Sequence, residues 1–112
     1  MKGNNMENMD LEEQVMGIII NAGQSRSLCY EALRHAKKGE FSEADGLLKE
    51  AQEFANQAHL VQTKLIEADE GTGKTKMTLI MVHAQDHLMT SMLAKELVTE
   101  MIDLHKKIEA KS

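Results

Sequence analysis

Apolar residues recur every three or four positions along three stretches of the chain. The stretches extend from Leu11 to Ala36, from Leu48 to Leu65 and from Leu79 to Ile108. Side chains at this spacing share one face of an α-helix, whereas a half-buried strand would alternate at every second residue. The pattern therefore predicts an all-α chain with three long helices.

Local signals predict where the first helix ends and the second begins. Lys37-Lys38-Gly39 combines a basic last turn with a glycine, so the first helix is expected to end near Gly39. Ser42 followed by Asp45 resembles a capping box. The second helix is therefore expected to begin there and to continue to about Ala68.

The most polar interior segment, residues 67–75, is the best candidate for a loop before the third helix. That helix is predicted from Thr75 or Lys76 to about Lys107, a length of roughly 45 to 50 Å at about 1.5 Å per residue. Two short loops between three long helices predict an antiparallel, up-down-up three-helix bundle. Residues 1–9 are polar and without periodicity, so they are interpreted as a disordered leader to a single domain of residues 10–112.

The composition suggests more apolar surface than one thin bundle can cover. Of the 112 residues, 42% are hydrophobic, and they include nine Met but only two Phe and one Tyr. The absence of proline and the supply of Met and Leu favour helices, while a bundle of this size buries only a modest core. We therefore expect the chain to associate with copies of itself.

Charge and hydropathy exclude several classes of function. The net charge is -5 and the basic residues are scattered, so nucleic acid is not an expected partner. The longest apolar run, around Ile18–Ile20, is too short to span a bilayer, and no signal peptide is evident. We expect a cytoplasmic protein without direct membrane insertion. The single cysteine, Cys29, lies on the apolar face of the first helix and is expected to be a buried thiol.

The segment Gly71–Thr75 imitates a phosphate-binding P-loop. The full pattern needs a glycine where Ala68 stands, and it needs a strand rather than a helix before the loop. Nucleotide binding is therefore not expected.

Two imidazoles interrupt the apolar pattern of the third helix. His83 and His87 lie one turn apart, on a face shared with Thr90 and Ala94, which are small enough to leave room around a ring. A neutral imidazole is a good nitrogen nucleophile near pH 7. A zinc site is the alternative, but no Glu follows His83 in a His-Glu-x-x-His frame and no third ligand is obvious.

Asp86 is the only charged member of the apolar stripe of the third helix. The stripe consists of Leu79, Val82, Asp86, Met89, Leu93, Leu97, Met101, Leu104 and Ile108. A carboxylate buried alone costs several kcal/mol, so it should be neutralised, paired or bound to a cation. A homotrimer meets this need, because three Asp86 carboxylates on the threefold axis would hold a hard ion such as Mg²⁺, one per trimer.

The segments Gly17–Arg26, Ala58–Thr63 and Val82–Ser91 closely resemble the lactose/cellobiose class of enzyme IIA components of the bacterial sugar phosphotransferase system. The resemblance covers roughly residues 10–110, and the block around His83 is highly specific.

The resemblance implies roles for individual residues. His83 would accept a phosphoryl group from the phosphocarrier HPr on Nε2 and pass it to a cysteine of the IIB component. Asp86 would bind a metal ion on a trimer axis. The resemblance does not itself assign His87 and Gln85, but their positions next to His83 would allow them to orient the ring or hold the phosphate, and Gln85 is equally plausible as a plain solvent-facing residue.

Two alternatives remain open at this level. Ala84 and the Leu60-Val61 pair resemble the cellobiose or diacetylchitobiose branch more than the lactose branch, so a lactose-specific IIA is the alternative within the class. The sugar itself would be bound by a membrane IIC component, an indirect partner. Outside the class, the chain could be a non-catalytic helical oligomer that acts as an interaction module and in which His83 is a packed polar residue.

Overall fold

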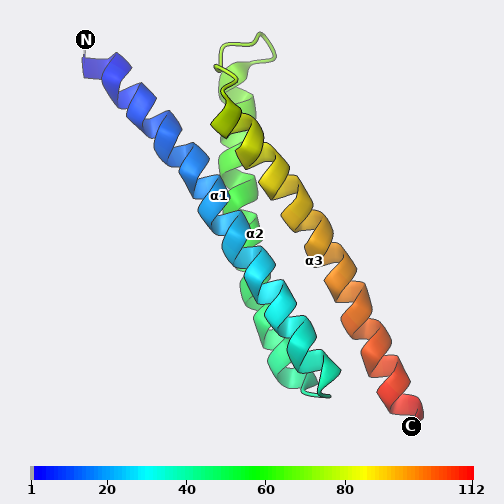
Figure 1. Ribbon diagram of the computed structural model, residues 1–112. Coiled ribbons are helices and arrows are strands. Elements are labelled where there is room, and N and C mark those ends of the chain that lie inside the picture. The colour runs from blue at the N-terminus through cyan, green and yellow to red at the C-terminus, as the bar shows by residue number, and fades with distance from the viewer. Residues whose placement is uncertain (1) are drawn as a thin grey trace.

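The computed structural model describes the backbone of residues 2–112 and the side chains from Leu11 onward. It contains three helices, α1 (Lys2–Lys37), α2 (Phe41–Asp69) and α3 (Leu79–Lys111). Figure 1 shows α2 returning along α1, and α3 then running back from the loop at the end of α2. The prediction of an all-helical chain with three helices is confirmed over the described residues.

Helix α1 lies at the centre of the packing. It contacts both α2 and α3 extensively, whereas α2 and α3 contact each other much less. The result is a rod with extents of 66 × 23 × 20 Å. The buried residues of α2 include Ala44, Ala51, Ala55 and Ala58, and such small side chains let neighbouring helices approach closely.

The apolar core consists of two clusters along the rod. One joins Val15, Ile18, Ala22, Ala58, Leu65, Met81, Ala84 and Leu88, and the other joins Cys29, Ala32, Ala36, Ala44, Ala51, Val98 and Ile102. Two buried polar residues, Ser25 and Ser91, fall between the clusters along α1 and α3. The Oγ of Ser25 donates a hydrogen bond of 2.8 Å to the carbonyl oxygen of Ala51, which ties α1 to α2 at this level.

The turn between α1 and α2 differs from the predicted capping box. The N-cap of α2 is Glu40, and no side chain caps the helix there, so the assignment of Ser42 as the cap was wrong. Gly39, with a φ of 80°, closes the turn, because its amide and that of Glu40 donate to carbonyls at the end of α1. The Glu40 carboxylate meets Nδ1 of His35 at 2.7 Å. The second helix can therefore begin immediately after the turn.

Helix α3 begins later than the predicted Thr75 or Lys76. Thr78 is its N-cap, and the Thr78 Oγ1 accepts a hydrogen bond from the amide of Met81 at 3.3 Å. In the preceding loop, the Asp69 carboxylate accepts from the amides of Gly73 at 3.3 Å and Thr75 at 2.8 Å. In the glycine-rich segment that imitates a P-loop, backbone amides thus donate to the carboxylate of Asp69 from the same chain.

The bounds of α1 include residues 2–9, which were predicted to be a disordered leader. The backbone of these residues continues the helix instead, and their side chains lie outside the described part. The chain has no proline, and after Gly3 no glycine occurs before Gly17, so no strong helix breaker interrupts residues 4–16.

Candidate active site

The stripe of α3 that carries Asp86 lies on the outside of the single chain. Its apolar members are between 45% and 86% exposed, with Met101 and Leu79 at the two limits. Against the other helices α3 instead buries Met81, Ala84, Leu88, Ser91, Val98 and Ile102. Helix α3 is therefore apolar on two faces, and only one of them is used within the chain.

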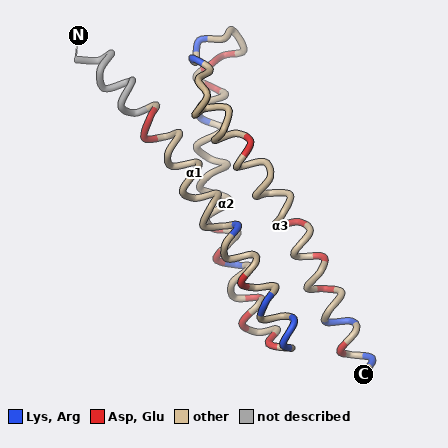
Figure 2. Tube along the Cα trace, viewed as in Figure 1, with Lys and Arg blue, Asp and Glu red and all other residues tan. Residues whose placement is uncertain are grey.

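Asp86 is an exposed carboxylate in uncharged surroundings. No other Asp, Glu, Lys or Arg occurs from Leu79 to Ala94, and Figure 2 shows the contrast with the more charged C-terminal half of α3. None of the ion pairs in the described part of the chain involves Asp86. The isolation inferred from the sequence is therefore retained in the fold.

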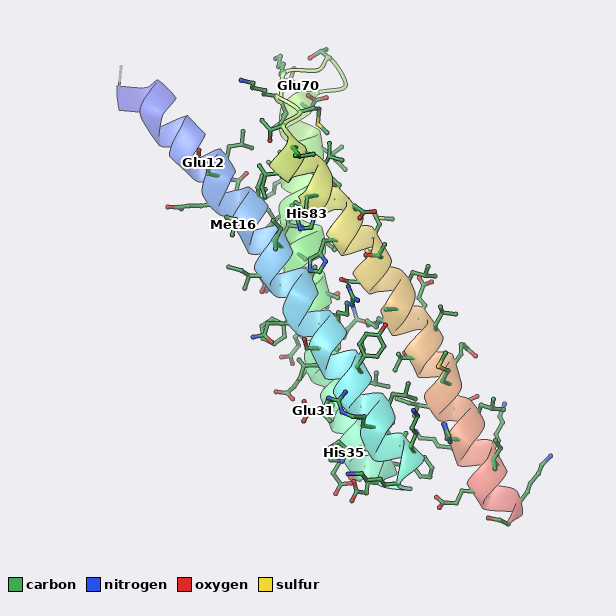
Figure 3. All side chains as sticks on the ribbon, viewed as in Figure 1. Glu12, Met16, Glu31, His35, Glu70 and His83 are labelled. Carbon is green, nitrogen blue, oxygen red and sulfur yellow. The ribbon has the colours of Figure 1, made fainter. Side chains whose placement is uncertain are left out.

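His83 and His87 form a stacked pair on α3. Their ring centroids are 5.9 Å apart and the ring planes differ by 8°. The helix repeat explains the pair, because residues four apart lie one above the other. His83 is exposed while His87 is half-buried, and Figure 3 shows the His83 ring on the side of α3 toward α1.

Thr90 shares this face but is engaged with the helix backbone. Its Oγ1 donates to the carbonyl oxygens of Asp86 at 2.9 Å and His87 at 3.2 Å. The Thr90 hydroxyl therefore bonds to the preceding turn of α3 and not to the ring of His83 or His87.

Gln85, predicted as a second supporting residue, faces another helix. Its Oε1 accepts a hydrogen bond from Nε2 of Gln62 on α2, and its own Nε2 contacts the sulfur of Met81. Residues two apart on a helix point in nearly opposite directions, so Gln85 and His83 are not brought together within one chain. His59 lies elsewhere again, in a cleft of about 120 Å³ between α2 and α3 whose lining does not include His83.

A mostly apolar groove opens between α1 and the start of α3. Its volume is about 560 Å³, and it is lined by Leu11, Glu12, Val15, Met16, Lys76, Thr78, Ile80 and Met81. Ile80 precedes His83 by about one helical turn. The groove therefore lies on the N-terminal side of His83, and its lining includes neither imidazole.

Gly23 is a contact of the site that the sequence analysis did not single out. A side chain at this position of α1 would meet Nε2 of His87. The sequence offers two signals: Gly23 lies in the interior of a predicted helix, where glycine is unfavourable, and it belongs to the segment Gly17–Arg26 that resembles the family. Neither signal says which residue of a distant helix fills the space.

Within the described residues, no group of three or more His, Cys, Asp or Glu side chains is placed to hold a metal ion. None of the three helices, as far as they are described, combines the length and the apolar character that crossing a membrane requires.

Most of the chain, including the histidine pair, matches a known protein family. Residues 13–106 match the family model described as the lactose/cellobiose-specific IIA subunit of the PTS system. The chain belongs to this family. This IIA chain is therefore a phosphotransferase component, and the resemblance recognised in its sequence is confirmed.

Individual relatives agree with the family match. The chain is 60% identical over 101 residues to the PTS system N,N'-diacetylchitobiose-specific EIIA component of Escherichia coli strain K12, covering 90% of this chain and 87% of the relative. The crystal structure of the PTS cellobiose-specific enzyme IIA from Bacillus anthracis has a TM-score of 0.86 at 44% identity, covering 90% and 93% of the two chains.

A third relative was solved with a partner. The IIA(chitobiose)-HPr complex of the N,N'-diacetylchitobiose branch of the Escherichia coli phosphotransferase system matches with a TM-score of 0.78 at 60% identity, covering 88% of this chain and 96% of the other. The shared fold of three helices is thus found in solved members of the family.

Proposed function

We propose that this IIA chain is a phosphocarrier with His83 as its phosphorylated residue. Nε2 of His83 would attack the phosphorus of the phosphoryl group on HPr, so that the bond to the donor breaks and a P–N bond forms. A cysteine thiolate of the IIB component would then attack the same phosphorus, breaking the P–N bond and forming a P–S bond. The observation that carries the proposal is the exposed His83 ring, stacked on His87 within the segment that matches the family.

The donor and the acceptor would use one surface in turn. HPr is proposed as the donor because a relative 60% identical to this chain was solved in complex with HPr. One imidazole cannot serve two distant surfaces, so IIB would dock over the same apolar groove on the N-terminal side of His83. Such exchange requires transient binding, for which a small apolar patch with a polar rim is suited. The exchange would take place in the cytoplasm.

The sugar specificities of two relatives favour a β-linked disaccharide as the transported sugar. The 60% identical relative is specific for N,N'-diacetylchitobiose and a solved relative for cellobiose. We propose that the sugar is one of these two and that it is bound and phosphorylated through a membrane IIC component.

The supporting residues would act in different ways. His87 would hold the His83 ring through the stack. Gln85 would fix α3 against α2 through its hydrogen bond to Gln62, rather than by touching the phosphoryl group within the same chain.

The exposed stripe of α3 supports assembly as a homotrimer of up-down-up bundles. Eight apolar side chains of the stripe are at least 45% exposed in the single chain, and a threefold contact between α3 helices would cover them. Within one chain Asp86 supplies only a single carboxylate. No cluster of potential metal ligands surrounds it among the described residues. Three Asp86 residues around the axis would provide oxygen ligands that suit Mg²⁺, so the ion fits the assembly and not the isolated chain.

Phosphoryl transfer to His83 can be tested by incubating the chain with phosphorylated HPr and measuring its mass. The wild-type chain is expected to gain one phosphoryl group, and His83→Ala is expected to gain none while retaining its helix content. His105→Ala, a change near the far end of α3, is a matched control that should still be phosphorylated. An acid-labile phosphate on the His83→Ala chain would refute the assignment.

The same experiment separates the phosphocarrier from a non-catalytic helical oligomer. The exposed apolar stripe would also suit a purely structural assembly. If the wild-type chain accepts no phosphoryl group from HPr yet sediments as an oligomer, the structural alternative replaces the phosphocarrier.

A further inference from the structure

Gly23 stands where α1 approaches the half-buried histidine of α3. A Cβ built on Gly23 would lie 3.4 Å from Nε2 of His87, and that nitrogen is the only heavy atom it would meet within 4 Å among the described residues, apart from atoms of α1's own local backbone and the adjacent residues. Space at this point of α1 is therefore occupied by one specific ring.

The backbone does not require glycine at this position. Gly23 lies in the interior of α1, and its φ is not among the positive values found at Gly39, Gly71 and Gly73. Glycine is less favourable than alanine in a helix interior. Gly17, also inside α1, has open space within 4 Å of the position that a Cβ would take. The two glycines thus differ in what stands opposite them.

The contact continues to His83 through the ring stack. The edge of the His87 ring that carries Nε2 is turned toward Gly23, and a face of the same ring is turned toward His83, with centroids 5.9 Å apart and planes 8° from parallel. A shift of His87 away from α1 would therefore change the support under the His83 ring.

We propose that Gly23 is a positioning residue for phosphoryl transfer, because its missing side chain sets how closely the His87 ring approaches α1 and thereby the orientation of His83. The inference rests on the proposed role of His83. Gly23 would not contact the phosphoryl group, because it would act through the ring of His87.

Two substitutions at Gly23, each with a matched control, test the proposal. Gly23→Ala places a methyl group in van der Waals contact with Nε2 of His87, and Gly23→Leu adds a larger side chain on the same side of α1. Gly17→Ala and Gly17→Leu make the same changes in the same helix with open space opposite. We expect Gly23→Leu to slow transfer from phosphorylated HPr about 10-fold, the lower end of the range for orienting groups, and Gly23→Ala to slow it less. The Gly17 variants should transfer at the wild-type rate.

A double-mutant cycle with His87 distinguishes positioning from general damage to the fold. In the His87→Ala background, Gly23→Leu should cause no further loss of rate, because the ring through which it acts is gone. An equal loss in both backgrounds, or a loss in the Gly17→Leu chain as large as in Gly23→Leu, would overturn the proposal. If Gly23→Leu does not fold, Gly23→Ala carries the same cycle.

A readout without phosphoryl transfer separates this proposal from the proposed function. In the unphosphorylated chain, Gly23→Ala should shift the imidazole nitrogen resonances of His87 and His83, whereas Gly17→Ala should leave them in place. Unchanged resonances would refute the positioning role even if His83 is phosphorylated. Shifted resonances in a chain that accepts no phosphate would support the geometry and refute the function.

Discussion

At the scale of single residues, the exposed His83 ring depends on its neighbour for a fixed orientation. Among the described residues, no hydrogen bond to the His83 ring is found. The ring instead stacks on the ring of His87. Transfer of a phosphoryl group is mainly a matter of positioning and of stabilising charge on the phosphoryl oxygens. A residue that holds the nucleophile is therefore expected to matter, though less than the nucleophile itself.

Replacement of His87 by Ala is expected to slow phosphoryl transfer by about 10- to 100-fold without abolishing it, as is typical when an orienting group is lost. Stopped-flow or quench-flow kinetics with phosphorylated HPr would measure the change. Thr90→Val is the control on the same face, because the Thr90 hydroxyl is bonded to backbone carbonyls and not to either ring. Complete loss of transfer in His87→Ala would contradict a role limited to orienting the His83 ring.

Cys29 offers a test by pH. Burial raises the pKa of the Cys29 thiol above its ordinary value of 9.0, against smaller lowering effects from the charge of Lys95 and a hydrogen bond with Ser25. A raised pKa in the folded state means that the unfolded state loses the thiol proton first as pH rises. The contribution of this group to stability is therefore complete below about pH 9 and declines above it.

The free energy of unfolding should consequently fall more steeply as pH rises above about 9 for the wild-type chain than for Cys29→Ala. Denaturant titrations of both chains at these pH values would measure the difference, since the lysines and Tyr30 are common to both. Parallel pH profiles would show that the thiol is not protected from ionisation by burial.

At the scale of the helices, two buried serines provide a matched pair. Ser25 is 1% exposed and bonds the carbonyl of Ala51 across to α2. Ser91 is 2% exposed, and its Oγ has no hydrogen-bond partner among the described residues. The two hydroxyls should therefore contribute to stability with different signs.

Ser25→Ala is expected to lower the free energy of unfolding by about 1 kcal/mol, the usual value of one buried hydrogen bond. Ser91→Ala should leave stability unchanged or raise it, because an unbonded hydroxyl is removed from the interior. Chemical denaturation of the two variants would test this. An equal loss in both would mean that Ser91 has found a partner, such as a bound water.

At the scale of the whole molecule, the outer face of α3 determines the proposed assembly. An apolar stripe with one carboxylate would be covered in a trimer, where three Asp86 groups cannot all remain ionised without a cation between them. Exchanging a buried charge for a hydrophobic side chain is often neutral or stabilising.

Asp86→Leu should therefore remove the metal ion while keeping the trimer or strengthening it. Sedimentation equilibrium and metal analysis of the purified chain would report both properties, and Glu96→Leu, an exposed acid farther along α3, is the control expected to keep the ion. A monomeric Asp86→Leu chain, or one ion still retained per trimer, would contradict this account of Asp86.

The local pattern of the sequence was sufficient for the three helices and for the histidine block. The predicted stripe of α1, with Val15, Ile18, Ala22 and Cys29, is buried as expected, because helical periodicity is a property of neighbours along the chain. His83 was identified by the residues around it, and its stack with His87 follows from a spacing of four on one helix.

The tertiary structure decided what lies opposite each of these residues. Periodicity shows that α3 has an apolar stripe, but not that Met81, Ala84 and Leu88 form the face inside the chain while the stripe of Asp86 stays outside. The pairing of Gln85 with Gln62 and the approach of His87 to Gly23 likewise depend on residues that come from different helices. A sequence read along one helix carries no information on these contacts, because they arise only when the helices pack.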